Sequence, residues 1–417
     1  MLRAARLGLC LIFSSGALTL RADAQALSPA ESFHVGDFAH ARTAFAQAFD
    51  REPSNAAAAT ALGTLALYDN KCSEAQHWLR TALRLEPSNR RAMLLLAESY
   101  RRQDNYAAAA DQFATAGSTA EAELFQSFHD RPYQIEMQAQ TVRIPFALSD
   151  PLPVLRMRVN GQSDALFLLD TGAPDVILDP GFAKELKLRA LGSELVTFAG
   201  GKQFSASAKL ASIAVADLRV RNLPVRLGPT RNLPFFPGKR IDGIVGTNFL
   251  YHFRPTIDYP HAALILRAKE LSGGLSGTPS AAKYGTVAPF WLAGDHFILT
   301  RASLNHIPKL FLIDSGLTGG AFSATRATVE QAHIALDEGA AKEGIGAGGR
   351  VRVIPIVAQR LAIGDAEQQN VGGGYVAGDP MFDIFPFEVG GLISQEYLKH
   401  YSVTFDFDAM TLTLAVP

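Results

Sequence analysis

The sequence predicts an all-α solenoid of short helical repeats followed by a mostly β unit with two related lobes. Three observations predict this fold class. A Pro-Ser-Asn peptide recurs in an Ala- and Leu-rich first part, the hydrophobic pattern changes from helical to alternating near Tyr133, and an apolar run that ends in Asp, a hydroxyl residue and Gly occurs twice. The 417 residues leave room for roughly three domains of about 150 residues each.

The first 24 residues have the form of a secretory signal. Arg3 and Arg6 precede an uncharged, mostly apolar run at 7–20, and Ala-Asp-Ala at 22–24 supplies small residues at the spacing that a signal peptidase reads. The apolar run is shorter than the about 20 residues that span a bilayer. We therefore expect export, with no transmembrane segment after signal removal; an uncleaved N-terminal anchor is the alternative.

Composition and charge narrow the class of protein further. The chain is 48% hydrophobic and 19% charged, and its formal net charge is -1. This balance gives no electrostatic reason to expect nucleic acid or an anionic membrane as a partner. Of the two cysteines, Cys10 lies inside the predicted signal and only Cys72 follows it. No internal disulfide is expected, so stability must come from burial.

Residues 26–123 are predicted to form helical repeats. The peptide Pro53-Ser54-Asn55 returns as Pro87-Ser88-Asn89, 34 residues later. The segment resembles tetratricopeptide (TPR) repeats, with one full unit that starts at Ala56 and partial units on either side. Such arrays resemble peptide-binding modules, and they can also serve as packing platforms, so both roles stay open. The matching positions of the full unit are Leu62, Gly63, Ala75, Leu79, Ala82 and Pro87.

From about Tyr133 the sequence turns to β structure. Residues 155–159 alternate apolar and basic side chains and lead into Asn160-Gly161, a hairpin signal, before the apolar run 165–169. The Gly- and Ser-rich stretch 272–283 is the clearest linker by composition. We interpret the strand-rich stretches on either side of it as two lobes.

The second strand-rich stretch repeats the first. Asp170-Thr171-Gly172 follows one apolar run, and Asp314-Ser315-Gly316 follows another, 144 residues later. Because the order of later segments is also kept, one duplicated β fold explains both stretches. The later pairs are 243–246 with 391–394 and 256–259 with 404–407.

The duplicated Asp motif is the candidate catalytic centre. A carboxylate at the end of a buried strand needs a partner, a ligand or water, and the following glycine allows a turn that brings backbone N–H groups near it. If the lobes pack about a pseudo-two-fold axis, Asp170 and Asp314 face each other. Two close carboxyls share one proton, so the ionised one can activate water while the other binds the scissile carbonyl. This chemistry needs no metal and no cofactor.

These motifs resemble the aspartic peptidase superfamily over residues ~140–417. The first motif is closest to the retroviral (retropepsin-like) type and its bacterial relatives, and two lobes in one chain are similar to the pepsin arrangement. The resemblance implies a two-lobed acid-protease fold and water-mediated proteolysis by Asp170 and Asp314. The residues implied to support the two active-site loops are Thr171, Gly172, Ser315 and Gly316.

Two positions depart from the family pattern, both in the second lobe. Ser394 stands where glycine is expected, and Leu317 follows the second motif where a small or hydroxyl residue is usual. The resemblance also implies a hairpin flap over the substrate, and 196–208 and 344–354 are the candidates, one per lobe. The second candidate fits a G-x-G-x-x-G pattern, but an alternating strand follows it instead of a helix, which favours a hairpin tip over nucleotide binding.

The sequence thus predicts an exported aspartic endopeptidase, periplasmic or secreted, that acts on peptide or protein substrates. Its repeats offer a site for a protein partner, and a monomer suffices because both aspartates lie in one chain. The alternative is a catalytically inactive peptide-binding or scaffolding protein of the cell envelope that acts through its repeats. The predicted domains are 1–24 (signal peptide), 26–123 (repeats), 124–139 (linker), 140–271 (lobe 1), 272–283 (inter-lobe linker) and 284–417 (lobe 2).

Overall fold

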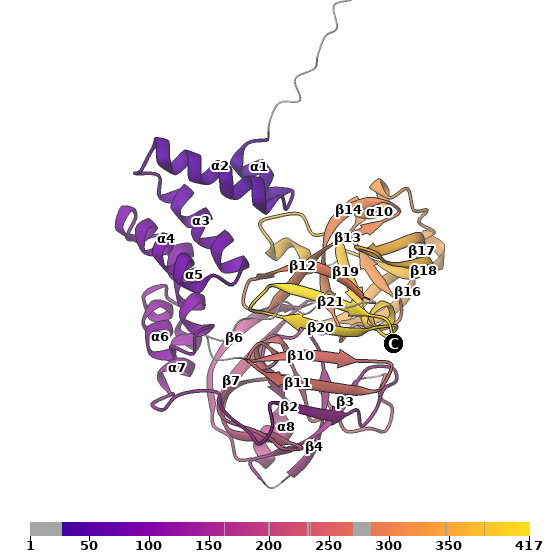
Figure 1. The fold of residues 1–417 in the computed structure, drawn as a ribbon. Helices are drawn as coiled ribbons and strands as arrows, with labels where there is room; N and C mark the ends of the chain where they lie inside the picture. Colours follow the sequence, from indigo (N-terminus) through magenta and orange to yellow (C-terminus); the bar gives the residue numbers. More distant parts are fainter. Residues whose placement is uncertain are drawn as a thin grey trace, which may run out of the picture.

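The computed structural model describes residues 27–161, 163–198, 201–231, 233, 235–269, 285–346, 348–378 and 380–417. The predicted signal peptide (1–24) and inter-lobe linker (272–283) lie outside these residues. In Figure 1 a curved stack of helices runs along one side of a β part made of two halves. None of the described helices is both long and apolar enough to cross a bilayer.

Seven helices of the described chain precede the β part, and each packs on the next. The side chains of Asn55 and Asn89 cap the starts of α3 and α5. Each accepts a hydrogen bond from the backbone N–H three residues further along the chain, at 2.9 and 3.0 Å. The recurring Pro-Ser-Asn peptide is therefore a recurring helix start. Gly63 lets α3 and α4 approach closely, because a Cβ there would lie 2.6 Å from Leu79 Cγ. The helices are α1 (Pro29–His34), α2 (Phe38–Arg51), α3 (Ala56–Tyr68), α4 (Cys72–Leu85), α5 (Arg90–Arg101), α6 (Tyr106–Thr115) and α7 (Thr119–Gln126).

Residues 124–139, which the sequence predicts as a linker, are part of the folded structure. Helix α7 extends into this stretch, and β1 (Gln134–Met137) pairs antiparallel with β8 (Leu218–Leu227) at the edge of the first sheet. The side chains of Phe125, Phe128 and Tyr133 are buried in the main hydrophobic core. Three large aromatic side chains thus pack the connection firmly between the repeats and lobe 1.

Lobe 1 is built on an eight-stranded sheet with the order β1-β8-β5-β9-β4-β3-β7-β6. Strands β3 and β4 form the hairpin predicted at Asn160-Gly161, and β4 then runs parallel to β9. The elements of this lobe are β3 (Val154–Val159), β4 (Ser163–Leu169), β5 (Val176–Leu178), α8 (Pro180–Glu185), β6 (Ala190–Phe198), β7 (Gly201–Val215), β8 (Leu218–Leu227), β9 (Gly243–Val245) and α9 (Thr247–Leu250).

A thirteen-stranded sheet contains lobe 2 and continues into lobe 1, in the order β16-β17-β18-β15-β19-β14-β13-β12-β21-β20-β10-β11-β2. Strand β14 lies parallel to β19, as β4 lies parallel to β9 in lobe 1. The elements are β2 (Thr141–Pro145), β10 (Phe253–Asp258), β11 (Ala263–Ala268), β12 (Gly285–Ala293), β13 (Phe297–Leu304), β14 (Ile307–Asp314), β15 (Phe322–Ala324), α10 (Arg326–Gln331), η1 (Glu338–Ala340), β16 (Lys342–Gly346), β17 (Gly349–Ile363), β18 (Ala366–Ala377), η2 (Pro380–Ile384), β19 (Gly391–Ser394), α11 (Gln395–Leu398), β20 (Ser402–Asp406) and β21 (Thr411–Ala415).

The two lobes meet where β10 pairs antiparallel with β20. In this pair Thr256 lies opposite Thr404, and their hydroxyl oxygens are 2.7 Å apart. The two threonines occupy equivalent places in the duplicated sequence, so an approximate two-fold axis passes between them. The mostly β region after the repeats is therefore two-lobed, as the duplication predicts.

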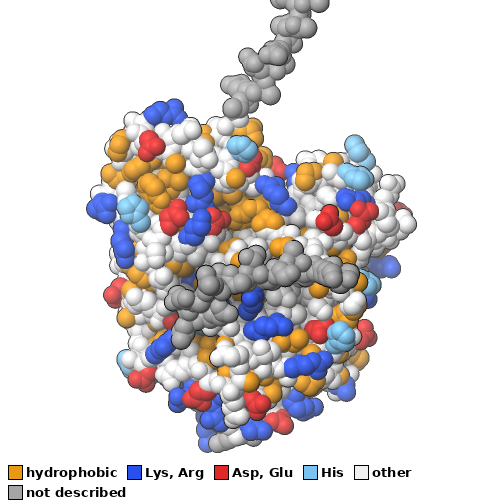
Figure 2. Space-filling model, viewed as in Figure 1, with side chains coloured by type: hydrophobic (Ala, Val, Ile, Leu, Met, Phe, Trp, Pro, Cys, Tyr) orange, Lys and Arg blue, Asp and Glu red, His pale blue; other side chains and the backbone are white. Residues whose placement is uncertain are grey.

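The helical segment contacts both lobes. At its N-terminal end, Phe33, Phe38 and Tyr68 surround Phe387 of lobe 2, with ring centroids between 5.2 and 6.0 Å from that ring. At the other end α7 packs on β6, where the backbone N–H of Gly192 donates to a glutamate of α7 at 3.1 Å. Figure 2 shows apolar side chains gathered over the helices at the upper left. The repeats are thus fastened to the two lobes at separate places.

Candidate active site

Equivalent strands of the two lobes position the two aspartates. Strand β4 ends one residue before Asp170, and β14, the equivalent strand of lobe 2, ends at Asp314. Both strands lie in the interior, where Leu169 and Ile313 are buried next to the two aspartates. This burial explains why both runs are apolar on both faces, and it delivers each Asp at the carboxyl end of an interior strand.

Four hydrogen bonds lock the two Asp loops together across the axis. The Thr171 hydroxyl donates to the carbonyl of Ile313 at 2.9 Å and accepts from the Ser315 N–H at 3.0 Å. In return the Ser315 hydroxyl donates to the carbonyl of Leu169 at 3.1 Å and accepts from the Thr171 N–H at 2.9 Å. Both hydroxyls are buried, so these bonds are well shielded from water. Thr171 and Ser315 thus each join their own Asp loop to the loop of the other lobe.

The two glycines of the motifs let the carboxyls come together. The Gly172 N–H donates to Asp170 Oδ1 at 2.8 Å, and the Gly316 N–H donates to Asp314 Oδ1 at 2.9 Å. A Cβ on Gly172 would lie 2.7 Å from Asp314 Cγ, and one on Gly316 would lie 2.2 Å from Asp170 Cγ. Each carboxyl therefore rests against the backbone of the opposite motif, where any larger residue would collide with it.

The two carboxyls interact directly and titrate as a pair. A side-chain hydrogen bond joins Asp170 and Asp314. Burial raises the pKa of Asp170 above its ordinary value, against the hydrogen bond from Gly172. Burial, and then the negative charge of Asp170, raise the pKa of Asp314 well above its ordinary value. The arrangement thus favours one shared proton over two ionised carboxylates.

Ser394 fits into lobe 2 because the adjoining loop is longer there. Its hydroxyl donates to the carbonyl of Gly320 at 2.5 Å and accepts a backbone N–H of α11 at 3.1 Å. The counterpart in lobe 1, Gly246, has no such space, since a Cβ there would lie 2.5 Å from the carbonyl oxygen of Asp175. The loop that follows the second Asp motif is two residues longer than the loop after the first. The departure at this position is accommodated by that loop.

Leu317 also leaves the Asp loop in the same form as in lobe 1. Its backbone N–H is hydrogen-bonded to Asp314, as the N–H of Ala173 is to Asp170. Its side chain packs with the apolar cluster that contains Phe387, between lobe 2 and the repeats. The larger side chain therefore adds to this cluster.

Both hairpins predicted as flap candidates form, and their tips meet. Strands β6 and β7 make the hairpin of lobe 1, and β16 and β17 make that of lobe 2. A Cβ on Gly348 would lie 2.4 Å from the backbone nitrogen of Gly201, so the two backbones are in contact. The glycine-rich pattern of lobe 2 is thus a hairpin tip, and the two hairpins connect the lobes.

His296 is a residue near the dyad that the sequence did not indicate. Its Nε2 lies 3.0 Å from the carbonyl oxygen of Gly172, and its charge acts to lower the pKa of Asp170. It lies in the turn between β12 and β13, outside every motif. A single histidine in a turn carries no sequence signal of this kind, because its partner lies in the other lobe. Within the described residues, no cluster of three or more His, Cys, Asp or Glu side chains is arranged to hold a metal ion.

Fold and site together define a TPR segment joined to an aspartyl-protease-like β unit. Comparison with known families agrees: residues 155–249 match the aspartyl protease family model, and residues 60–122 match a tetratricopeptide repeat model. The resemblance of the first Asp motif to aspartyl proteases and that of the helical segment to TPR repeats are confirmed.

Solved structures that match include a retropepsin-like aspartic protease from Rickettsia conorii. It is 22% identical, covers 33% of this chain and 95% of its own chain, and has a TM-score of 0.24. A search of curated proteins finds no match.

Proposed function

We propose that this protein is an exported aspartic endopeptidase that hydrolyses peptide bonds through a water molecule activated by Asp170 and Asp314. One observation carries the proposal: each carboxyl lies against the glycine of the opposite motif, and the two carboxyls share a hydrogen bond. Such a pair disfavours the folded state at neutral pH, because each carboxyl opposes ionisation of the other. A catalytic role accounts for an arrangement that costs stability.

The proposed reaction is a direct attack by water. The ionised carboxyl takes a proton as the water oxygen bonds to the scissile carbonyl carbon, and the protonated carboxyl gives its proton to the carbonyl oxygen, so that a gem-diol forms and the dyad still holds one proton. As the C–N bond breaks, that proton passes to the leaving nitrogen, and a diol hydroxyl gives its proton to the other carboxyl, which restores the singly protonated dyad. The N–H groups of Gly172 and Gly316 fix the orientation of both carboxyls. No step requires a metal or a cofactor.

Digestion of a peptide library across pH, with single Asn substitutions at the dyad, tests this function. We expect the mature protein to cleave peptides, and Asp170→Asn and Asp314→Asn each to lower kcat/KM by at least about 1,000-fold. Asp164→Asn is a matched control, because Asp164 lies on β4 but its side chain is 59% exposed. This variant should cleave at the wild-type rate.

Two outcomes would overturn the proposal. One is cleavage at the wild-type rate by both Asn variants. The other is peptide binding without turnover at any pH, which would favour an inactive peptide-binding protein that acts through its repeats.

Export is proposed from residues 1–24. The mature protein is expected in the periplasm or medium with Gln25 as its first residue, which N-terminal sequencing of each cell fraction measures. A chain that keeps Met1 and sediments with membranes would instead indicate an uncleaved anchor. The repeats of the exported chain would offer their surface to a protein partner or substrate on the same side of the membrane.

A further inference from the structure

The turn between β12 and β13 brings His296 against the Asp170 loop. His296 is 6% exposed, and its Nε2 lies 3.0 Å from the carbonyl oxygen of Gly172. Its Nδ1 lies 2.5 Å from Oδ1 of the preceding residue, Asp295. The same Gly172 donates its N–H to Asp170. Gly172 is thus hydrogen-bonded to Asp170 through its N–H, and its carbonyl oxygen contacts His296.

Both ring nitrogens of His296 face hydrogen-bond acceptors. A carbonyl oxygen and an ionised carboxylate only accept, and a neutral imidazole has a single N–H, so the neutral ring leaves one of the two contacts without a proton. The imidazolium donates to both. The pKa of Asp295 is consistent with this ion pair: burial opposes ionisation, but the charge and hydrogen bond of His296 and the charges of Arg226 and Arg101 lower it.

Charged groups from several elements surround this pair. Arg226 of β8 has its Nη2 3.9 Å from Oδ2 of Asp295 and its Nε 3.1 Å from Asp175. Arg101 approaches from α5, and Asp170 is the acid at the end of β4. The ring of Phe297 covers His296, with centroids 3.8 Å apart. Cations and anions alternate around the turn, so nearby carboxylates balance the charge of a protonated His296 ring.

The equivalent turn in lobe 1 carries no imidazole. Counted back from Asn160 and Asn305, which begin the matching hairpin turns, Asp150-Pro151 occupies the place of Asp295-His296. Proline has no side-chain donor. The hydrogen bonds between the two Asp loops are therefore symmetric, but only the turn of lobe 2 supplies a cation. This is the turn that contacts the Asp170 loop.

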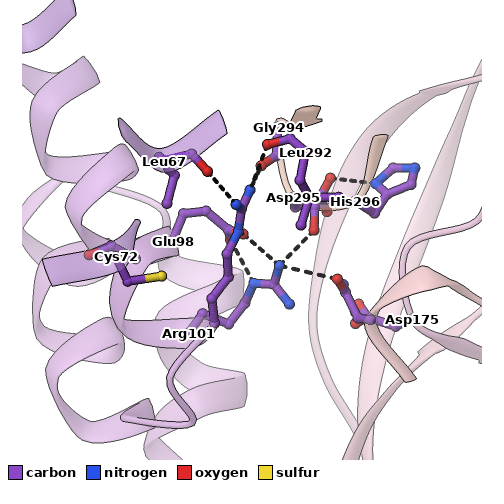
Figure 3. A network of polar contacts seen from close by, with 12 residues as sticks. Leu67, Cys72, Glu98, Arg101, Asp175, Leu292, Gly294, Asp295 and His296 are labelled. Atoms are coloured by element: carbon purple, nitrogen blue, oxygen red, sulfur yellow. Dashed lines mark hydrogen bonds and ion pairs between the residues drawn. The ribbon is translucent and has the colours of Figure 1, made fainter. Parts of the chain in front are cut away.

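Residues at the end of helix α5 hold this turn, which lies between the helices and the strands in Figure 3. Arg101 donates to the carbonyl of Asp295 at 2.7 Å, and Arg102 donates to the carbonyl of Gly294 at 2.9 Å. Glu98 binds both guanidinium groups, at 2.6 Å from Arg101 Nε and 2.8 Å from Arg102 Nε. Because Glu98 and Arg102 are buried, this network fixes the position of the turn relative to the helix.

We propose that His296 is a positioning residue of the dyad: as an imidazolium held by Asp295 and by the turn that α5 anchors, it keeps Asp170 ionised. Asp170 is then the base that takes the proton from water, and Asp314 is the acid. This inference rests on the proposed function and adds an assignment of the two roles. It also makes the TPR segment a structural part of the active site.

The acid limb of the pH profile of kcat/KM tests the charge of His296. His296→Gln keeps an amide donor for the Gly172 carbonyl but removes the charge. Because a nearby cation lowers a carboxyl pKa, its loss should move the acid limb up by about one pH unit, with activity recovered at higher pH. His261→Gln is the control, since His261 also pairs with an aspartate but its side chain is 62% exposed. An unchanged acid limb in His296→Gln would overturn the inference.

The contribution of α5 is tested by Arg101→Ala and Arg101→Lys, with Arg91→Ala on the exposed face of the same helix as control. Both Arg101 variants should move the acid limb in the same direction as His296→Gln, and the Arg91 variant should not. The lysine variant keeps the positive charge but cannot contact Glu98 and the Asp295 carbonyl at the same time. A shift in this variant therefore reports loss of the anchor and not loss of the fold. A wild-type profile in both Arg101 variants would show that the turn does not depend on the helix.

NMR of the chain with ¹⁵N-labelled histidine distinguishes failure of this inference from failure of the proposed function. At pH 7 both ring nitrogens of His296 should carry protons, with the signals assigned by their loss in His296→Gln. A neutral ring at pH 7 overturns the inference even if the protein is an active peptidase. Absence of cleavage by the wild-type protein at every pH overturns the base assignment together with the proposed function.

Discussion

At the scale of single residues, the candidate site depends on groups whose roles differ although their surroundings are nearly symmetric. Thr171 and Ser315 exchange equivalent hydrogen bonds across the axis. Asp170 and Asp314 each receive a glycine N–H. The main local asymmetry is the ring of His296, which lies against the carbonyl of Gly172 in the first motif. Residue-scale experiments can therefore separate what supports the loops from what sets the charge of the dyad.

Removing the Thr171 hydroxyl should destabilise the fold. Thr171→Val keeps the shape of the side chain but leaves the Ser315 N–H and the Ile313 carbonyl without this buried partner. We expect the free energy of unfolding to fall by about 2–3 kcal/mol, measured by urea denaturation. Thr171→Ser keeps the hydroxyl, as lobe 2 does naturally, and should lose less than about 1 kcal/mol. Equal losses in the two variants would mean that the hydrogen bonds do not matter.

The raised pKa of Asp314 predicts a pH-dependent gain in stability when this residue is replaced. A carboxyl whose folded pKa lies above its unfolded value favours the folded state at low pH, and this contribution is lost as the pH rises through the folded pKa. Asp314→Asn should therefore raise the free energy of unfolding at pH 7 by at least about 1 kcal/mol. Near pH 3.8, the ordinary value of the group, the gain should disappear. Urea denaturation at both pH values measures this, and a variant no more stable than the wild type at pH 7 would contradict it.

At the scale of elements, the duplicated hairpins differ in what supports them. The lobe 1 hairpin begins at β6, which packs on α7 of the repeats. There Gly192 has φ +55°, and a Cβ on it would lie 2.8 Å from Ala120 Cα. The bulge at this glycine lets strand and helix backbones touch. The lobe 1 hairpin is therefore tied to the helical segment at its base.

A methyl group on Gly192 should loosen this contact. Gly192→Ala combines an unfavourable backbone conformation with a clash against Ala120, and we expect a loss of about 2 kcal/mol of unfolding free energy and faster amide hydrogen exchange in β6. Gly161→Ala is a matched control, because Gly161 has φ +72° but no atom within 4 Å of its Cβ position. It should lose only about 1 kcal/mol and leave exchange in β6 unchanged. Equal effects would show that the helix contact is unimportant.

Sequence patterns predicted the elements that depend on local signals. The repeating Asn helix starts, the Asn160-Gly161 turn and the apolar strands before each Asp are all visible along the chain, and each forms as expected. Strand β1 and the contact of His296 were not predictable, because their partners lie in distant segments. Burial of Tyr133 in particular depends on surfaces that only the folded lobes create. Local sequence patterns were therefore enough to predict the two lobes. The segments that connect the lobes to the repeats depend on tertiary contacts, which such patterns do not show.

At the scale of the whole molecule, the repeats act as a platform that both lobes contact. Contacts occur at Phe387 in lobe 2, at the β12–β13 turn and at β6 in lobe 1. The sequence left open whether the repeats bind peptides or support the rest of the chain. The buried contacts favour support, because α1, α2 and α3 all contribute side chains to one buried apolar cluster with lobe 2. A groove of about 530 Å³ lined by Phe45 and Arg91 remains beside this contact.

The contact at Phe387 predicts that the helical segment and lobe 2 stabilise each other. The Phe387 ring is 3% exposed, and it packs against three aromatic rings of the repeats. Phe387→Ala should lower the free energy of unfolding by about 3–4 kcal/mol and split one urea transition into two, because the segment then unfolds before the lobes. Phe204→Ala, at a ring that is 77% exposed, should change stability by less than about 0.5 kcal/mol. If Phe387→Ala unfolds in a single transition at the wild-type midpoint, the repeats and lobe 2 are joined by their other contacts, and α5 becomes the principal connection.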